Sequence, residues 1–188
     1  MKRDRIIQTK QELRERIIKL LKSQKEEERL TKSLIIQRKL FYMPEFKKAC
    51  VVLFYASFNG EVDTFSMMEQ ALCINKKIAL PRLNTENKDL IPTQIKALGD
   101  LEVGSYGIKQ PTKGEPVALE AVDMVVVPGL AFDKNHYRLG RGGGHYDRFL
   151  KTLPSRIPTV GLAFDFQIVD TLPQIEEHDV PVTHVLVN

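Results

Sequence analysis

The sequence predicts an α/β fold in which helices cover the faces of a mostly parallel sheet. Continuous apolar runs of strand length at 49–55, 124–127 and 159–163 are typical of strands that are buried on both faces. Segments with helical periodicity alternate with these runs, which favours parallel strands joined by helices. A chain of 188 residues is long enough to bury a substantial core, so we expect a single domain over 1–188.

Two helices are expected at the start of the chain, over 5–25 and 28–42. The apolar residues of the first, at helical spacing, are Ile6, Leu13, Ile17, Leu20 and Leu21. The second is expected to end before Pro44. Its inward-facing residues are predicted to be Leu30, Leu34, Ile35 and Leu40. We expect these basic helices, within 5–42, to pack on the rest of the domain.

The middle of the chain mixes one further helix with short strands. Asp63 or Thr64 is expected to cap a helix after the first strand. A short strand at 77–80 is expected to stop at Pro81, and 82–121 should form short strand pieces among turns.

The last third completes the sheet. A helix is expected from about residue 144 to 153, and a final strand over 182–187. The segment 128–148 follows a buried strand and therefore lies where ligands bind in such folds, beyond the carboxyl ends of the strands.

Positive charge is concentrated near the N-terminus. Residues 1–48 contain 15 Lys and Arg against 7 Asp and Glu, whereas the whole chain has a net charge of +4. This bias fits either a surface that binds nucleic acid or a solvated helix face that lends cations to an anionic ligand. Because no nucleic-acid-binding motif accompanies it, we favour the second interpretation.

Composition also indicates the compartment. No apolar run is long enough to span a bilayer, and the first residues form no signal-peptide core, so we expect a cytoplasmic protein. Cys50 and Cys73 lie in apolar surroundings without the spacing of metal ligands. We expect both to be buried free thiols.

A glycine-rich loop at 138–148 carries the strongest functional signal. It reads Arg-Leu-Gly-Arg-Gly-Gly-Gly-His-Tyr-Asp-Arg, between an apolar strand and a predicted helix. Backbone amides at such a place bind anions, phosphates above all, and arginine adds paired donors. The spacing fits neither a Walker A motif nor a dinucleotide-binding fingerprint. A flexible surface loop is the alternative, which the clustered arginines disfavour.

Three carboxylates are candidates for the same site. Asp147 either balances the dipole of the predicted helix or binds magnesium beside phosphates, and Asp179 is a second candidate metal ligand. Glu61 is either a solvated loop residue or a ligand acceptor at the end of a strand. The four histidines lack metal-binding spacing, and of these only His145 lies within the glycine-rich loop.

The segments 127–133 and 138–150 together closely resemble the signature of the 5-formyltetrahydrofolate cyclo-ligase family. Further motifs follow in the order expected of that family, and the likeness covers nearly the whole chain. They are Lys10–Arg14, Glu61–Thr64, Gly107–Pro111, Gly161–Gln167 and His178–Pro181.

The resemblance implies a three-layer, Rossmann-like sandwich and an ATP-dependent ligase of one-carbon metabolism. Such an enzyme cyclises 5-formyltetrahydrofolate to 5,10-methenyltetrahydrofolate and releases ADP and phosphate, through a phosphorylated formyl (imidate) intermediate. It also implies Mg²⁺, with ATP as co-substrate. We expect a monomer that acts on these small molecules without a nucleic-acid or membrane partner.

The resemblance further implies the residues of the site. ATP would be bound by Lys10, Arg14, Arg138, Leu139, Gly140, Arg141, Gly142, Gly143, Gly144, His145 and Tyr146. The folate would be bound by Ala56, Glu61, Arg141, Gly142, Gly143, Gly144 and His145. Lys10 and Arg141 would be catalytic, and Asp147 and Asp179 would hold the metal.

Four positions depart from the family pattern. His136 replaces a usual glycine, Gln110 replaces a usual glutamate, and Arg141 and His145 lie where aromatic residues are common. None of these departures removes the expected roles of Lys10, Arg14 and Asp147. Two other functions also stay open: an α/β protein that binds a nucleotide or sugar phosphate without folate chemistry, and an RNA-binding module that uses the basic helices.

Overall fold

The computed structural model describes residues 9–104 and 107–188. Its centre is a six-stranded sheet in the order β11-β9-β6-β1-β2-β3, in which only β3 runs antiparallel to its neighbour. The strands are β1 (Val51–Leu53), β2 (Lys77–Leu83), β3 (Leu90–Ile95), β6 (Met124–Val127), β9 (Thr159–Ala163) and β11 (His184–Val187). The predicted α/β fold with a mainly parallel sheet is confirmed.

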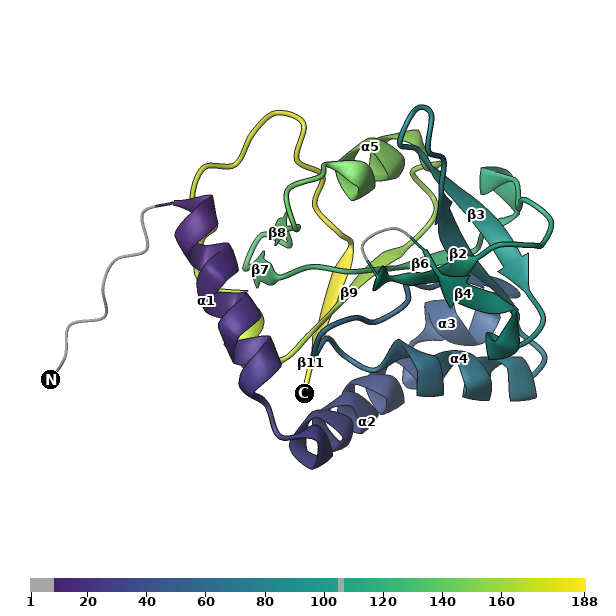
Figure 1. Cartoon of the computed structure of the whole chain (residues 1–188), viewed down its shortest axis with the longest axis horizontal. Helices are drawn as coiled ribbons and strands as arrows, with labels where there is room; N and C mark the ends of the chain where they lie inside the picture. Colours follow the sequence, from purple (N-terminus) through teal and green to yellow (C-terminus); the bar gives the residue numbers. More distant parts are fainter. Residues whose placement is uncertain (1–8, 105–106) are drawn as a thin grey trace, which may run out of the picture.

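Helices cover both faces of this sheet (Figure 1). One face packs against α1 (Lys10–Ser23), α2 (Glu26–Tyr42), α3 (Pro44–Lys48) and α4 (Thr64–Cys73), and the other packs against α5 (His145–Thr152). The side chains of β6 point alternately into the two cores. Val126 joins the core beneath α1–α4, whereas Val125 and Val127 join the core beneath α5, and all are fully buried. An apolar run without alternation therefore marks a strand that is buried on both faces.

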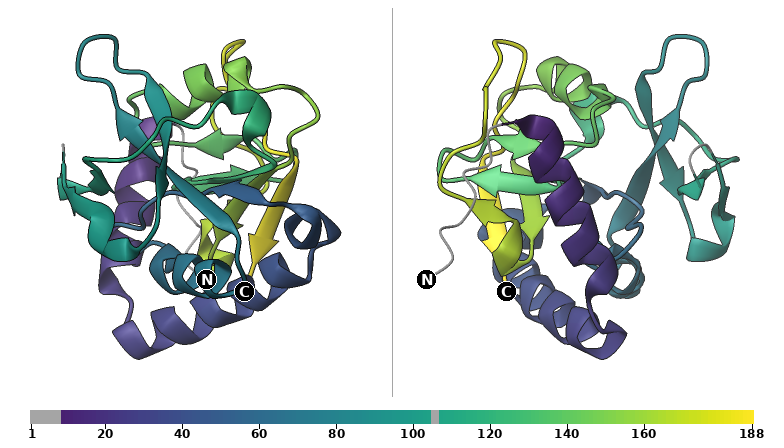
Figure 2. Two further views of the ribbon diagram at one scale, coloured as in Figure 1. Left: turned by 90° about the vertical axis from the view of Figure 1, so that its right-hand side faces the viewer. Right: turned by 60° about the vertical axis from the view of Figure 1, so that its left-hand side comes forward.

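Small strands complete the molecule beside the central sheet. β7 (Ala131–Asp133), β8 (Arg138–Leu139) and β10 (Ile168–Val169) form one sheet, and β4 (Leu101–Val103) pairs with β5 (Lys109–Pro111). Short 3₁₀ turns occupy Leu98–Asp100, Leu119–Ala121 and Asp165–Gln167. The β2–β3 edge of the central sheet and the β4–β5 pair lie together on one side of the molecule (Figure 2).

The N-terminal helix begins later than expected. Thr9 caps α1 by accepting a hydrogen bond from the backbone N–H of Glu12, so the helix starts at Lys10. Leu13 and Ile17 are buried, as predicted, and Leu20 is half-buried. Residues 5–8 of the predicted helix, with Ile6, lie outside the described residues.

The predicted inward face of α2 was largely wrong. Leu40 is buried, but Leu30 and Leu34 are each 43% exposed and Ile35 is 39% exposed. The helix carries apolar residues on several sides, so apolar spacing alone does not determine which side packs against the sheet. Polar contacts determine it. Ser33 Oγ accepts the N–H of Asp63, and Gln37 donates to the Gln70 side chain, so these two polar residues face inward.

Two other expectations were wrong. Pro81 does not stop β2, because its partner across the β2–β3 pair is Pro92. The carbonyl of Pro92 accepts the N–H of Val117, so it does not require an N–H from Pro81, and the strand continues. Cys50 and Cys73 are free but exposed, since each lies at the end of an element rather than within it. The expected cap by Asp63 is confirmed: its side chain accepts the N–H of Phe65.

No helix in the described ranges 9–104 and 107–188 is long and apolar enough to cross a membrane.

Candidate active site

A cavity of about 720 Å³ opens beyond the carboxyl ends of β1, β2 and β6. Every site residue named from the sequence lines it: Lys10, Arg14, Ala56, Glu61, Arg138, Leu139, Gly140, Arg141, Gly142, Gly143, Gly144, His145, Tyr146, Asp147 and Asp179. Residues that are far apart in the chain thus meet at one place, although their individual roles stay predictions.

The glycine-rich loop forms one wall of this cavity. It leaves β8 at Leu139 and enters α5 at His145, with Gly142 at φ +102° and Gly144 at φ +64°. Both lie in the left-handed region that glycine occupies without strain, and Gly144 is the residue immediately before the helix. Arg14 Nε donates to the carbonyl of Gly140 at 3.0 Å, so α1 supports the loop. The N-terminus of α5 therefore lies at the cavity, where its amides favour an anion.

Arg138 and Asp147 form an ion pair beneath the loop. The guanidinium Nη1 of Arg138 lies 3.0 Å from Asp147 Oδ1 and donates to the carbonyl of Val180, also at 3.0 Å. The Arg138 side chain is only 2% exposed, whereas that of Asp147 is 20% exposed. Arg138 thus joins α5 to the segment 176–180 and holds Asp147 at the cavity.

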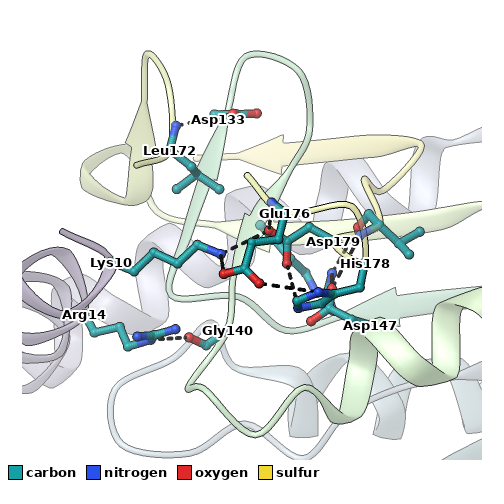
Figure 3. A network of polar contacts seen from close by, with 11 residues as sticks. Lys10, Arg14, Asp133, Gly140, Asp147, Leu172, Glu176, His178 and Asp179 are labelled. Carbon is teal, nitrogen blue, oxygen red and sulfur yellow. Dashed lines mark hydrogen bonds and ion pairs between the residues drawn. The ribbon is translucent and has the colours of Figure 1, made fainter. Parts of the chain in front are cut away.

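Lys10 and Asp179 form a second pair at the start of α1 (Figure 3). Lys10 Nζ lies 3.1 Å from Asp179 Oδ2 and 3.3 Å from Glu176 Oε1. Burial acts to raise the pKa of Asp179, but the backbone N–H of Glu176 and the Lys10 ammonium outweigh it and hold the pKa below its ordinary value. Asp179 is therefore ionised at neutral pH and fixed by its own loop.

Glu61 and Arg141 form a third pair in the cavity. Arg141 Nη2 donates to Glu61 Oε1 at 2.7 Å, and the N–H of Phe58 donates to Glu61 Oε2 at 3.0 Å. The Arg141 guanidinium also lies 5.4 Å from the ring centre of Phe58. Burial raises the pKa of Glu61 above its ordinary value, although Arg141 and the Phe58 N–H oppose this. Of the two alternatives for Glu61, the solvated loop residue is excluded because the side chain is buried.

Another part of the cavity lining is largely apolar, and most of it was missed from the sequence. It consists of Tyr55, Phe58, Pro81, Leu83, Leu90 and Ile108, with Lys109 and Gln110 beside them. Gly107–Pro111 was named as a motif, but no site residue was assigned within it. Tyr146 also lines the cavity. Burial raises the pKa of its phenol, and the phenol oxygen has no hydrogen-bond partner among the described residues.

The departures from the family pattern have structural explanations. His136 has φ +64°, the left-handed conformation that suits the usual glycine. Gln110 accepts the N–H of Leu83 through its side-chain oxygen, which a glutamate oxygen does equally well. His145 Nδ1 lies 3.0 Å from the carbonyl of Lys88, so it contacts the β2–β3 hairpin tip.

We predict that Glu61→Gln raises the melting temperature at neutral pH. A carboxyl whose folded pKa lies above its unfolded value destabilises the fold once it ionises, and a neutral glutamine removes this cost. The advantage should therefore disappear as the pH falls through about 4.3, the ordinary glutamate pKa. Thermal melting of both proteins between acidic and neutral pH measures it. A lower melting temperature at neutral pH would mean that the Arg141 pair outweighs burial.

Comparisons with known proteins show which family the chain resembles. The family model described as "5-formyltetrahydrofolate cyclo-ligase family" matches residues 6–188. A 5-formyltetrahydrofolate cyclo-ligase of Mus musculus is 30% identical, over 94% of this chain and 92% of the mouse protein. One of Haemophilus influenzae is 35% identical, over 76% of this chain and 78% of its own.

A solved structure is also similar. The 5,10-methenyltetrahydrofolate synthetase of Aquifex aeolicus, determined by NMR, superposes with a TM-score of 0.83 at 36% identity. The match covers 95% of this chain and 89% of the Aquifex chain. With a family model that matches almost the whole length and a cavity built from the family's motifs, the chain belongs to the 5-formyltetrahydrofolate cyclo-ligase family.

Proposed function

We propose that this protein cyclises 5-formyltetrahydrofolate to 5,10-methenyltetrahydrofolate with the hydrolysis of ATP to ADP and phosphate. The observation that carries the proposal is that one cavity has both a charged and an apolar lining. The glycine-rich loop, Lys10 and Arg14 offer amides and cations, which suit a triphosphate. Phe58 and Leu83 belong to the apolar part of the lining, which suits an aromatic ring system.

The chemistry needs ATP and the folate side by side in one cavity, and therefore needs both the charged and the apolar lining. The formyl oxygen attacks the γ-phosphorus of ATP, and the bond from γ-phosphorus to the bridging oxygen breaks as ADP leaves. N10 then attacks the formyl carbon, loses its proton, and the C–O bond breaks as phosphate departs. A formamide oxygen is a poor leaving group, and phosphorylation makes it a good one. The protein mainly positions the reactants and stabilises phosphate charge, for which Lys10 and Arg141 are the proposed catalytic residues.

We propose that Asp147 and Asp179 hold Mg²⁺ beside the phosphates. A hard cation prefers carboxylate oxygen and commonly uses one or two carboxylates together with phosphate oxygens. Both aspartates line the cavity, and the N–H of Val180, next to Asp179, lies 3.5 Å from Asp147 Oδ1. No group of three or more metal-binding side chains occurs among the residues that the structure describes, which suits a cation shared with a nucleotide. When bound, Mg²⁺ neutralises charge on the phosphates.

An absorbance assay tests the proposed function. Purified protein with ATP, Mg²⁺ and 5-formyltetrahydrofolate should develop the near-ultraviolet band of the methenyl product, and omission of any one component should prevent it. Absence of the band in the complete mixture would refute the function. ATP binding without the band would favour a nucleotide-binding protein that lacks folate chemistry.

We predict that Lys10→Ala weakens ATP binding about tenfold while folate binding changes little. Lys10 lines the cavity, where its ammonium contacts Asp179 and is available to a phosphate. Calorimetric titration with each substrate separately measures the two affinities. Equal loss of both would mean that Lys10 only supports the fold of α1.

The cavity volume is that of a small-molecule site, which supports ATP and a folate rather than nucleic acid as partners. That the protein is a cytoplasmic monomer stays a prediction.

A further inference from the structure

We propose that Arg29 is a positioning residue for the reaction: from outside the cavity, it fixes the backbone of Glu61 so that the buried carboxylate faces the folate. The inference rests on the proposed function, in which Glu61 binds the folate, and adds to it a residue outside the motifs identified in the sequence. Arg29 is not part of the cavity lining, so it acts through Glu61 rather than on the substrate.

Glu61 follows a tight turn between β1 and α4, outside any strand. Asn59 has φ +50° and Gly60 has φ +84°, and the N–H of Glu61 donates to the carbonyl of Phe58 at 3.3 Å. Two successive residues with positive φ are typical of a type I′ turn. Because no strand ladder includes this turn, contacts from other elements must hold it in place.

Side chains from the end of α1 and from α2 hold the segment 58–63 on both sides of the carboxylate. The two helices run in different directions and meet near residue 24 (Figure 1). Gln24 Nε2 donates to the carbonyl of Gly60 at 3.0 Å. Ser33 Oγ accepts the N–H of Asp63, also at 3.0 Å. The backbone is thus fixed one residue before Glu61 and two residues after it.

Arg29 bonds the backbone of Glu61 itself. Its Nη1 donates to the carbonyl of Glu61 at 2.9 Å, while its Nε and Nη2 donate to the Glu26 carboxylate at 2.8 and 2.6 Å. The Arg29 side chain is 15% exposed, whereas that of Glu26 is 69% exposed. The paired bonds to Glu26 orient the planar guanidinium, so that its remaining nitrogen points at Glu61.

The Glu61 carboxylate is sensitive to a shift of its backbone. It accepts Arg141 Nη2 at 2.7 Å and the N–H of Phe58 at 3.0 Å, and its side chain is only 10% exposed. A displacement of about 1 Å in a group that positions a substrate can cost about 100-fold in rate. Loss of the Arg29 contact should therefore impair the use of folate, while the residues of α1 that line the cavity keep their places.

Steady-state kinetics of Arg29→Met test the assignment. Methionine keeps an apolar stem and removes all three hydrogen bonds. We expect the KM for 5-formyltetrahydrofolate to rise about tenfold and the KM for ATP to change by less than about twofold. Arg29→Lys, which restores the charge and a donor, should recover part of the folate affinity. A residue with a merely structural role would change both constants alike, or would only lower the amount of folded protein that melting curves detect.

Lys32→Met is the matched control on the same helix. The Lys32 side chain is 22% exposed and pairs with Glu28 at 3.0 Å and with Asp165 at 3.6 Å, rather than with the segment 58–63. It should keep the wild-type KM for folate. An equal rise in this KM in Lys32→Met and Arg29→Met would overturn the assignment, because any lost ion pair of α2 would then have the same effect.

A double-mutant cycle tests whether Arg29 acts through Glu61. Calorimetric titration gives the dissociation constant for 5-formyltetrahydrofolate in the wild type, in Arg29→Met, in Glu61→Gln and in the double variant. Arg29→Met should weaken binding about tenfold in the wild type but no more than about twofold when residue 61 is already glutamine. Equal effects in the two backgrounds would mean that Arg29 does not act through the carboxylate.

The outcomes distinguish the two proposals. A folded Arg29→Met protein with wild-type folate affinity would overturn the positioning role and leave the proposed function standing. If the wild-type protein does not bind 5-formyltetrahydrofolate in the same titration, the proposed function itself is wrong.

Discussion

Replacement of Asp147 by asparagine is expected to lower turnover by about 100-fold or more, which corresponds to about 3 kcal/mol of lost transition-state stabilisation. Asparagine keeps the shape of the side chain and an oxygen that accepts a hydrogen bond from Arg138. It removes the charge through which a hard cation would be held against the phosphates. The absorbance assay at saturating ATP and folate measures the loss, and the Mg²⁺ concentration for half-maximal rate should rise.

The control is Asp170→Asn, which makes the same chemical change at an exposed aspartate outside the cavity. It should keep wild-type turnover. Unchanged turnover in Asp147→Asn would remove Asp147 from the metal site and leave it as a partner of Arg138 only.

Arg138→Met is expected to lower the free energy of unfolding by about 3 kcal/mol, because it removes one partner of a largely buried ion pair. The guanidinium is nearly inaccessible to solvent and joins Asp147 to the carbonyl of Val180. Methionine fills similar space without any donor. Asp147 then loses its ion pair and the carbonyl of Val180 loses its donor, which weakens the connection between the segment 176–180 and α5. Urea unfolding at neutral pH measures the change.

Arg156→Met is a matched control, since Arg156 makes an exposed hydrogen bond to the carbonyl of Glu120. Its loss should cost less than about 1 kcal/mol. Equal destabilisation by the two substitutions would show that the buried pair at Arg138 contributes no more than a surface hydrogen bond.

The fold was predictable where the signal is local. The apolar run at 124–127 predicted a strand buried on both faces, and all four residues of β6 are fully buried. The glycine-rich loop predicted a turn into a helix, because only glycine adopts the φ values of Gly142 and Gly144 without strain. Both features depend on the residues themselves and on their immediate neighbours.

The predictions of the inward face of α2 and of the end of β2 failed because both depend on residues that are distant in the sequence. The orientation of α2 depends on Asp63, which donates its backbone N–H to Ser33, and on Gln70, whose side chain accepts from Gln37. The continuation of β2 through Pro81 depends on the register that places Pro92 opposite it. Neither partner can be identified from periodicity, because periodicity describes one element at a time.

By itself, the sequence determined the α/β class, the apolar strands at the centre of the sheet, the position of the glycine-rich loop and the residues that the family motifs name. Only the tertiary structure decided how those residues are paired. Glu61 and Arg141 are 80 positions apart, and Lys10 and Asp179 are 169 positions apart, yet each pair is in direct contact. The physical reason is that a motif fixes backbone conformation and chemical type locally, whereas the burial of Glu61 and the charge balance of the cavity arise only when separate elements pack together.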